Sequence, residues 1–267
     1  MTTALWNSVN NYFIKMQELT GLCAPAKLAA AAGLTIDSDN GTGKPLEQVG
    51  SFTLGTNPVT PLAMSNAYAT IAAHGVYCSP IAMTGIVDTA GKQYAVPTPD
   101  CHQAIDPSLT DQLTGMLQGV VTHGTGTKVS DYYTGPAAGK TGTNDSRLMT
   151  WFDGYTPNLS AAVWVGIITP KKDDPGLVNV NIGGTGYGKV CGGCIAAPIW
   201  GEAFNAALAG TTVPAFNVPE TSGALPAPVA PAPPAAAPGS QPGGQAGGQA
   251  NSGGTGFIGG LFGGGTG

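Results

Sequence analysis

A close succession of three β-strand patterns restricts the fold of this chain more than any other feature. Strand-like segments cover residues 137–143, 149–155 and 161–168, and Gly, Asn and Pro punctuate the stretches between them. The connection Pro157-Asn158-Leu159 is short enough to join the last two strands as an antiparallel hairpin. We therefore predict an antiparallel sheet in this part of the chain.

Helical patterns lie on both sides of these strands. Thr60 as N-cap with Pro61 at the first helical position opens one helix, and Asp106-Pro107 opens another. Together with apolar residues at helical spacing and an Ala-rich run, these signals predict helices over residues 2–20, 26–32, 62–73, 106–120 and 195–208. Two further short strands flank a turn at Gly91. Helices, then consecutive strands, then a closing helix are typical of an α+β fold with an antiparallel sheet flanked by helices.

Composition divides the chain near residue 215. Residues 1–215 carry the helical and strand patterns, and we predict that they form one globular domain. From Pro219 onward a single charged residue, Glu220, is followed by a Pro/Ala run and by Gly-rich repeats. Such a segment has too little apolar side chain to offset the entropy of ordering it. We therefore predict that residues 216–267 form a disordered tail.

The composition also excludes several kinds of site. The net charge is −5 and the only basic cluster is the pair Lys171-Lys172, so nucleic-acid binding has no electrostatic basis. No apolar run of about 18 residues occurs, which predicts no membrane segment, and the N-terminus lacks the pattern of a signal peptide. The three histidines show no paired ligand spacing, so we expect neither a metal site nor a cofactor.

The five cysteines suggest an oxidising compartment. Cys78 and Cys101 flank a hairpin-like segment, and a disulfide between them would contribute about 3 kcal/mol. Cys191 and Cys194 have a spacing that suits a tight disulfide, a redox pair or half a metal site, and we favour the disulfide. Cys23 is predicted to be a small buried apolar residue.

A series of motifs follows one order along the chain. The motifs are Ser8-Val9-Asn10, Gly50–Gly55 with Val59–Leu62 and Ala67–Ala69, Gly124–Thr127, Gly139–Thr143, Trp151–Pro157, Val163–Gly166 and Ala197–Trp200. A Lys-Thr-Gly triplet belongs to the active-site signature of penicillin-binding proteins and serine β-lactamases. The chain resembles the C-terminal part of the transpeptidase domain of a class A penicillin-binding protein. The placement of Tyr77-Cys78 and Cys101 resembles the actinobacterial type.

The resemblance implies a role for each residue of the Lys-Thr-Gly segment. Lys140 would set a positive charge beside the site, where it favours the terminal carboxylate of a substrate and helps to hold Ser8. The hydroxyls of Thr141 and Thr143 would bind the same carboxylate, and the backbone N–H of Thr143 would be an oxyanion donor. Gly142 would let the substrate backbone lie flat against the strand.

The same resemblance implies partners and a reaction. Ser8 would relay a proton to the leaving amine, and the amide of Asn10 would bond the peptide group of the substrate. The expected ligands are peptidoglycan stem peptides ending in D-Ala-D-Ala, and β-lactams. The expected reaction is D,D-transpeptidation through an acyl-serine. The full-length parent is expected outside the cytoplasm, at the cell wall and membrane.

The nucleophile motif of the family, Ser-x-x-Lys, does not occur in the 267 residues. Thr125-Gly126-Thr127-Lys128 has the spacing but lies in a Gly-rich loop after a different helix, so we exclude it. The family places its nucleophile before the segment that begins here at Ser8. We therefore expect an N-terminally truncated domain, from a late start, a split gene or a real short product, that is inactive on its own. A non-catalytic binding module and a D,D-carboxypeptidase or β-lactamase-type hydrolase are the alternatives.

Overall fold

The computed structural model describes residues 1–39 and 41–218 of the chain. Its main sheet has three antiparallel strands in the order β5-β6-β7. The register pairs Thr141 with Phe152 and Phe152 with Val163. The three predicted strands and the hairpin at 157–159 are confirmed as β5 (Ala138–Thr143), β6 (Met149–Tyr155) and β7 (Ser160–Gly166).

Three of the predicted helices form close to their predicted bounds, and two of them begin at their predicted capping residues. The hydroxyl of Thr60 accepts a hydrogen bond from the Ala63 N–H at 3.1 Å, and the carboxylate of Asp106 accepts one from the Ser108 N–H at 2.8 Å. Each cap satisfies a backbone donor that the first helical turn leaves unpaired. The helices are α4 (Pro61–Ala72), α5 (Pro107–Thr122) and α6 (Ala197–Ala207).

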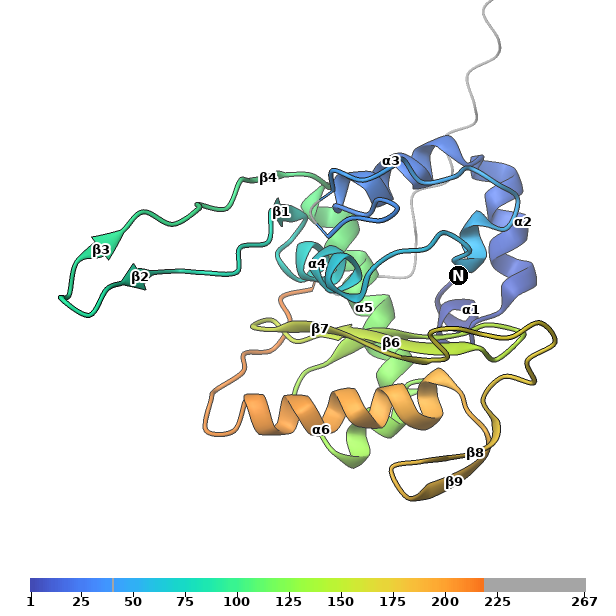
Figure 1. Cartoon of the computed structure of the whole chain (residues 1–267). Helices are drawn as coiled ribbons and strands as arrows, with labels where there is room; N and C mark the ends of the chain where they lie inside the picture. Colours follow the sequence, from blue (N-terminus) through green and yellow to red (C-terminus); the bar gives the residue numbers. More distant parts are fainter. Residues whose placement is uncertain (40, 219–267) are drawn as a thin grey trace, which may run out of the picture. The chain divides into compact units, whose positions relative to one another are not determined.

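Different helices cover the two faces of the sheet (Figure 1). On one face, Phe152 packs against Trp200 of α6, with ring centroids 5.5 Å apart. On the other, Tyr155 packs edge-on against Tyr68 of α4, and its hydroxyl lies 2.8 Å from that of Thr114 of α5. Because successive strand residues point to opposite faces, β6 contributes to a core on each side. The α+β prediction, with helices flanking an antiparallel sheet, is confirmed.

The predicted helix over residues 2–20 is wrong at one point, since the chain forms two helices there. Ser8 lies between them with φ at 52°, in the left-handed region. The cause is an anchor from outside the segment: the indole Nε1 of Trp6 donates to the Met116 carbonyl of α5 at 3.0 Å. The helices at this end are α1 (Thr2–Trp6), α2 (Asn10–Thr20) and α3 (Cys23–Ala31).

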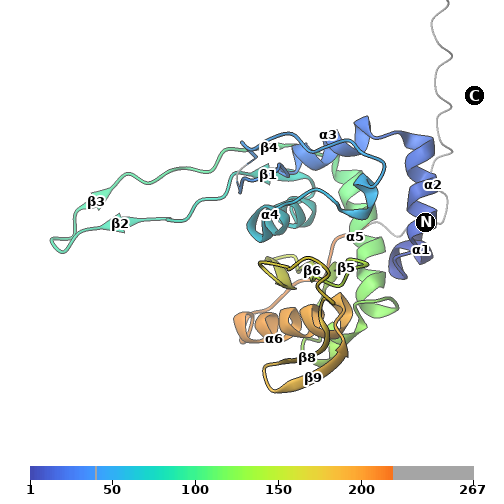
Figure 2. The ribbon, with the colours of Figure 1, turned by 45° about the vertical axis from the view of Figure 1, so that its right-hand side comes forward.

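The segment between α4 and α5 in the sequence forms a long hairpin arm that projects away from these helices (Figures 1 and 2). Near its tip the carboxylate of Asp88 accepts hydrogen bonds from the N–H groups of Ala90 and Lys92, each at 2.9 Å, which closes the predicted turn. At its base a disulfide joins Cys78 to Cys101, which are directly opposite in register. The strands of the arm are β1 (Val76–Cys78), β2 (Ile86–Val87), β3 (Gln93–Tyr94) and β4 (Cys101–Gln103).

A second hairpin, which our sequence analysis does not predict, precedes α6. It consists of β8 (Val178–Ile182) and β9 (Thr185–Lys189), joined by two glycines with positive φ. The apolar residues Val178, Val180 and Ile182 alternate with polar ones, which is the pattern of a half-buried strand. The remaining short helical segments are η1 (Phe52–Leu54), η2 (Thr127–Asp131) and the π-helical η3 (Gly192–Ala196).

The last described residues include the start of the predicted tail. Phe216, which composition places in that tail, packs edge-on against Tyr155 with ring centroids 5.5 Å apart. The rest of the predicted tail, residues 219–267, lies outside the described residues. Within residues 1–39 and 41–218, no helix combines the length and the apolarity that a membrane crossing needs.

Trp200→Ala tests the core between α6 and the sheet. Trp200 is fully buried, stacks on Phe204 and donates its indole N–H to the Gly154 carbonyl at 3.2 Å. We expect the substitution to lower the free energy of unfolding by about 4 kcal/mol, because it leaves a cavity and an unpaired carbonyl. Urea denaturation measures this. The adjacent Ile199, which is exposed, is the control: Ile199→Ala should cost less than about 1 kcal/mol. Equal losses for the two variants would contradict the packing.

Candidate functional site

Two of the predicted site residues meet although 132 positions separate them in the sequence. The ammonium Nζ of Lys140, on β5, donates a hydrogen bond to the hydroxyl of Ser8 and another to the Thr141 carbonyl at 2.8 Å. Lys140 is half-buried, whereas every other lysine of the chain is exposed. The fold therefore brings the predicted relay serine and the predicted cation into one site.

The segment that carries Ser8 is held in place through Trp6. Besides the indole bond to α5, the carbonyl of Trp6 accepts a hydrogen bond from the Thr125 N–H at 3.0 Å. A Cβ atom at Gly119 would collide with the Trp6 indole, and one at Gly124 would collide with the Trp6 carbonyl. The two glycines thus let α5 and the following loop close around Trp6, which fixes the position of Ser8.

Asn10 follows Ser8 by two positions in the sequence, as Gly142 follows Lys140. Asn10 is the first residue of α2 and its side chain is exposed to solvent. Gly142 follows Lys140 by two positions, so it lies on the same face of β5, and a Cβ there would lie 3.2 Å from the Cβ of Trp151. In the main sheet, β5 pairs with β6 on one side, and no strand of the described residues pairs with it on the other. An extended peptide can lie along such an edge.

The two threonines of the Lys-Thr-Gly segment point to the opposite face of β5 from Lys140. The hydroxyl of Thr141 lies 2.6 Å from that of Thr125. The hydroxyl of Thr143 accepts a hydrogen bond from the Gly192 N–H at 3.0 Å. A carboxylate bound at the edge of β5 can therefore contact Lys140 on one face of the strand and the two threonines on the other. The sequence alone does not assign Thr125 or Gly192 to the site, because their contacts come from tertiary packing.

A buried carboxylate lies opposite Lys140 in the sheet. Asp153 is its cross-strand partner in β6 and is only 7% exposed. The Oδ1 atom of Asp153 has no hydrogen-bond partner among the described residues. Burial raises the pKa of Asp153 to about 8, although the Lys140 charge opposes this. Burial likewise lowers the pKa of Lys140 to about 8, against the effect of Asp153.

Asp153 is the main functional candidate that sequence reasoning missed. The available signal was an acidic residue inside the otherwise apolar strand Trp151-Phe152-Asp153-Gly154-Tyr155. The carboxylate also influences α4: burial raises the pKa of Tyr68, and the nearby Asp153 charge raises it further. Asp153 thus lies between Lys140 on one strand and the helix that covers this face.

The cysteines form two disulfides, Cys78–Cys101 and Cys191–Cys194, with Cα atoms 4.1 Å and 4.9 Å apart. The prediction for Cys23 is wrong: its thiol is free and exposed. The reason is its position at the first residue of α3, a helix whose buried side chain is that of Ala26. Within the described part of the chain, no three His, Cys, Asp or Glu residues gather closely enough to hold a metal ion.

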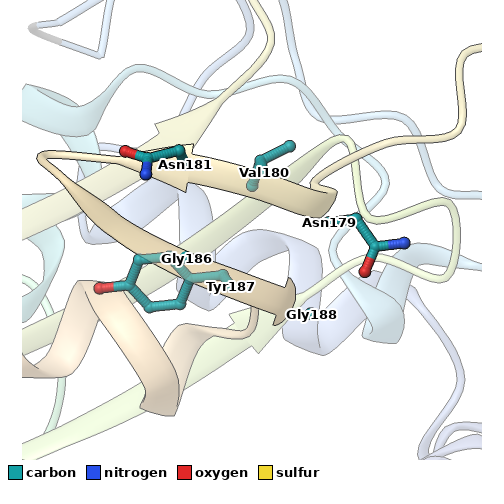
Figure 3. A pocket seen from close by; sticks show the side chains of 6 residues that line it. All are labelled: Asn179, Val180, Asn181, Gly186, Tyr187 and Gly188. Carbon is teal, nitrogen blue, oxygen red and sulfur yellow. The ribbon is translucent and has the colours of Figure 1, made fainter.

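The hollow in Figure 3 is distinct from this site. It has a volume of about 300 Å³ and is lined by the two strands of the β8–β9 hairpin, through Asn179, Val180, Asn181, Gly186, Tyr187 and Gly188. None of the predicted site residues lines it. The candidate site is therefore the edge of β5 with Ser8, and not this hollow.

Asp153→Asn tests the buried carboxylate. Between its ordinary pKa of 3.8 and about 8, folded Asp153 keeps a proton that the unfolded chain releases. The free energy of unfolding of the parent therefore falls as the pH rises through this window, and Asn removes the effect. We expect the stability of D153N relative to the parent to grow from about pH 4 to about pH 8 and then to level off. Urea unfolding at a series of pH values measures the difference.

The control for this experiment is the exposed Asp131, as Asp131→Asn. This substitution removes an acidic group of the same kind without removing a buried one, so its effect on stability should not grow over the same pH range. A difference between D153N and the parent that stays constant with pH would mean that burial does not hold a proton on Asp153.

Comparisons with known proteins identify the family of this chain. The model of the penicillin-binding protein transpeptidase domain matches residues 1–200. Penicillin-binding protein 1A of Clostridium acetobutylicum is 31% identical over 219 residues, which are 82% of this chain and 25% of that protein. The corresponding protein of Clostridium novyi is 34% identical over 164 residues, or 61% of this chain and 19% of its relative. The chain thus spans a quarter or less of the length of these relatives.

Solved structures point the same way. PonA1 of Mycobacterium tuberculosis, in complex with penicillin V, superposes with a TM-score of 0.65 at 28% identity, over 81% of this chain and 58% of that one. Penicillin-binding protein 1A of Haemophilus influenzae superposes with a TM-score of 0.67 over 82% of this chain and 36% of its own, and at 20% identity it supports the fold alone. The chain belongs to the penicillin-binding protein transpeptidase family, and its relatives include class A members.

Proposed function

We propose that this chain forms the part of a D,D-transpeptidase site that recognises the D-Ala-D-Ala end of a stem peptide, and that β-lactams occupy the same place. Cross-linking of peptidoglycan is the function of the family to which the chain belongs. The observation that carries the proposal is the hydrogen bond from Lys140 to Ser8, formed between the edge strand and a segment 132 residues away.

The geometry suggests how such a ligand is held. The peptide lies along the free edge of β5, with its terminal carboxylate near the half-buried ammonium of Lys140. Thr141 and Thr143 approach that carboxylate from the other face of the strand, and the missing side chain of Gly142 leaves room for the peptide backbone. The N–H of Thr143 is the proposed oxyanion donor.

On the ligand's other side, Ser8 and Asn10 act on the peptide bond that reacts. Ser8, which accepts a hydrogen bond from Lys140, keeps its own hydroxyl proton to donate to the leaving amine. The exposed amide of Asn10 offers both a donor and an acceptor to the peptide group of the ligand. These roles prepare the substrate for attack by a serine of the Ser-x-x-Lys type, a motif that this sequence does not contain.

A second candidate function is a binding module that recognises stem peptide and does not react with it. The absence of Ser-x-x-Lys within these 267 residues favours it for the chain on its own. A hydrolase of the carboxypeptidase or β-lactamase type would need the same missing nucleophile. We propose cross-linking for the longer parent and binding without acylation for this chain.

We further propose that the domain works outside the cytoplasm. The ligand proposed above is a stem peptide of peptidoglycan, the polymer of the bacterial cell wall. The two disulfides of this chain support the same location, since disulfides persist in oxidising compartments.

Lys140→Met tests carboxylate recognition. The probe is N-acetyl-Lys-D-Ala-D-Ala, and its C-terminal amide is the ligand control. Loss of a charge-assisted bond should weaken binding of the acid about 10- to 100-fold, with little effect on the already weak amide. Isothermal titration calorimetry measures both. Lys128→Met, at an exposed lysine, is the protein control and should leave the affinity unchanged. Equal affinity of the parent for acid and amide would contradict the proposal.

Incubation with a fluorescent penicillin tests acylation. Because the sequence contains no Ser-x-x-Lys, we expect no covalent adduct by mass spectrometry of the intact chain, while excess penicillin still competes with the peptide. A mycobacterial transpeptidase domain labelled in parallel is the positive control. A mass increase equal to one penicillin would mean that another hydroxyl attacks, and peptide mapping would identify it.

A further inference from the structure

A disulfide-closed turn packs directly against the Lys-Thr-Gly strand. Cys191 and Cys194 are bonded to each other, and the N–H of Cys194 also donates to the Cys191 carbonyl at 2.9 Å. The bridge closes the first turn of η3, the π-helical segment that leads into α6. Both cysteines are partly exposed, whereas Gly192 between them is buried.

The turn packs so closely against its neighbours that its two glycines have no room for a side chain. A Cβ atom at Gly192 would collide with the carbonyl of Trp151 and lie 2.6 Å from that of Gly142. A Cβ at Gly193 would collide with the carbonyl of Thr125. The turn is therefore fitted between β5, β6 and the loop after α5. Its position and that of the end of β5 depend on each other.

One hydrogen bond links the turn to a predicted ligand group. The N–H of Gly192 donates to the hydroxyl of Thr143 at 3.0 Å. A hydroxyl has two acceptor lone pairs and one proton to donate. Since Gly192 occupies one acceptor position, the proton of Thr143 is directed away from the turn. Thr143 is exposed, so its hydroxyl proton remains available to a carboxylate bound at the edge of β5.

We propose that the Cys191–Cys194 turn positions the Thr143 hydroxyl for the ligand carboxylate, and that opening the disulfide releases it, so that recognition depends on the redox state. This inference rests on the proposed function of the β5 edge. A dithiol reductant supplies two electrons and two protons: the bond between the two sulfur atoms breaks, two thiols form, and the reductant becomes its own disulfide. Cys191, Gly192 and Cys194 are positioning residues and do not touch the ligand.

The test uses the full chain with the substitutions C23S, C78S and C101S, so that Cys191–Cys194 is its remaining disulfide. Affinity for N-acetyl-Lys-D-Ala-D-Ala is measured before and after reduction with dithiothreitol. We expect reduction to weaken binding about tenfold, the size of one well-placed hydrogen bond. A variant that carries C191S and C194S but retains Cys78 and Cys101 should bind the peptide as weakly as the reduced protein does. Its affinity should be the same with and without dithiothreitol.

Thr143 variants distinguish positioning from a general structural effect. Adding Thr143→Val removes the acceptor, so reduction should then change the affinity by less than about twofold, whereas Thr143→Ser should keep the tenfold response. Equal responses in the Thr and Val proteins, or no response in either, would overturn the inference.

A second readout separates this inference from the proposed function. If the oxidised chain binds no peptide, the proposed function fails, but the methyl NMR signal of Thr143 still reports on the turn. It should shift on reduction while those of the buried Thr70 and Thr114 stay in place. An unmoved Thr143 signal would overturn the inference.

If reduction unfolds the chain, hydrogen exchange of backbone amides in the oxidised protein tests the inference instead. The Gly192 N–H should exchange at least about fivefold faster in T143V than in the parent, and at the parent rate in T143S. Equal exchange in T143V and the parent would overturn the inference.

Discussion

The alternation of side chains along β6 is the constraint on which both the core and the site depend. Phe152 faces α6 and fills the space beside Trp200, which forces its neighbour Asp153 to the other face. There the register sets Asp153 opposite Lys140. A slip of one residue would turn the carboxylate into the aromatic core beside α6 and move Phe152 to the face that α4 covers. The packing that stabilises the sheet therefore also decides where the charges of the site lie.

This arrangement costs stability at the point where a ligand would bind. Lys140 is half-buried and Asp153 is the one acidic residue of the described ranges that is buried. Two apolar side chains of similar volume would be less costly there, because the buried ammonium loses hydration and the buried carboxyl must hold a proton that the unfolded chain releases. Charged residues make up only 9% of the chain, so few other groups contribute to the field at the edge of β5. The half-buried ammonium of Lys140 thus lowers the stability of the fold, and it is also the charge best placed to attract a carboxylate.

Local patterns explain what the sequence alone could predict. The caps at Thr60 and Asp106 and the hairpin at 157–159 depend on neighbouring residues, so they were correct. The β8–β9 hairpin carried an alternating pattern that could have been recognised. The break at Ser8 could not, because it follows from the bond of Trp6 to Met116, 110 residues away.

Local sequence patterns could not predict the surroundings of the Lys-Thr-Gly strand either, because these also come from residues far apart in the sequence. Motif order identified Lys140, Thr141 and Thr143, but the partners of their side chains come from four separate segments: Ser8, Thr125, Asp153 and Gly192. Two of those segments carry glycines at their contacts, Gly124 beside Thr125 and the pair Gly192-Gly193, and a Cβ at any of the three would collide with a backbone carbonyl. Glycines near a site are often taken as a source of flexibility. Here they permit backbone contacts that no other residue allows, so these glycines make the site more rigid.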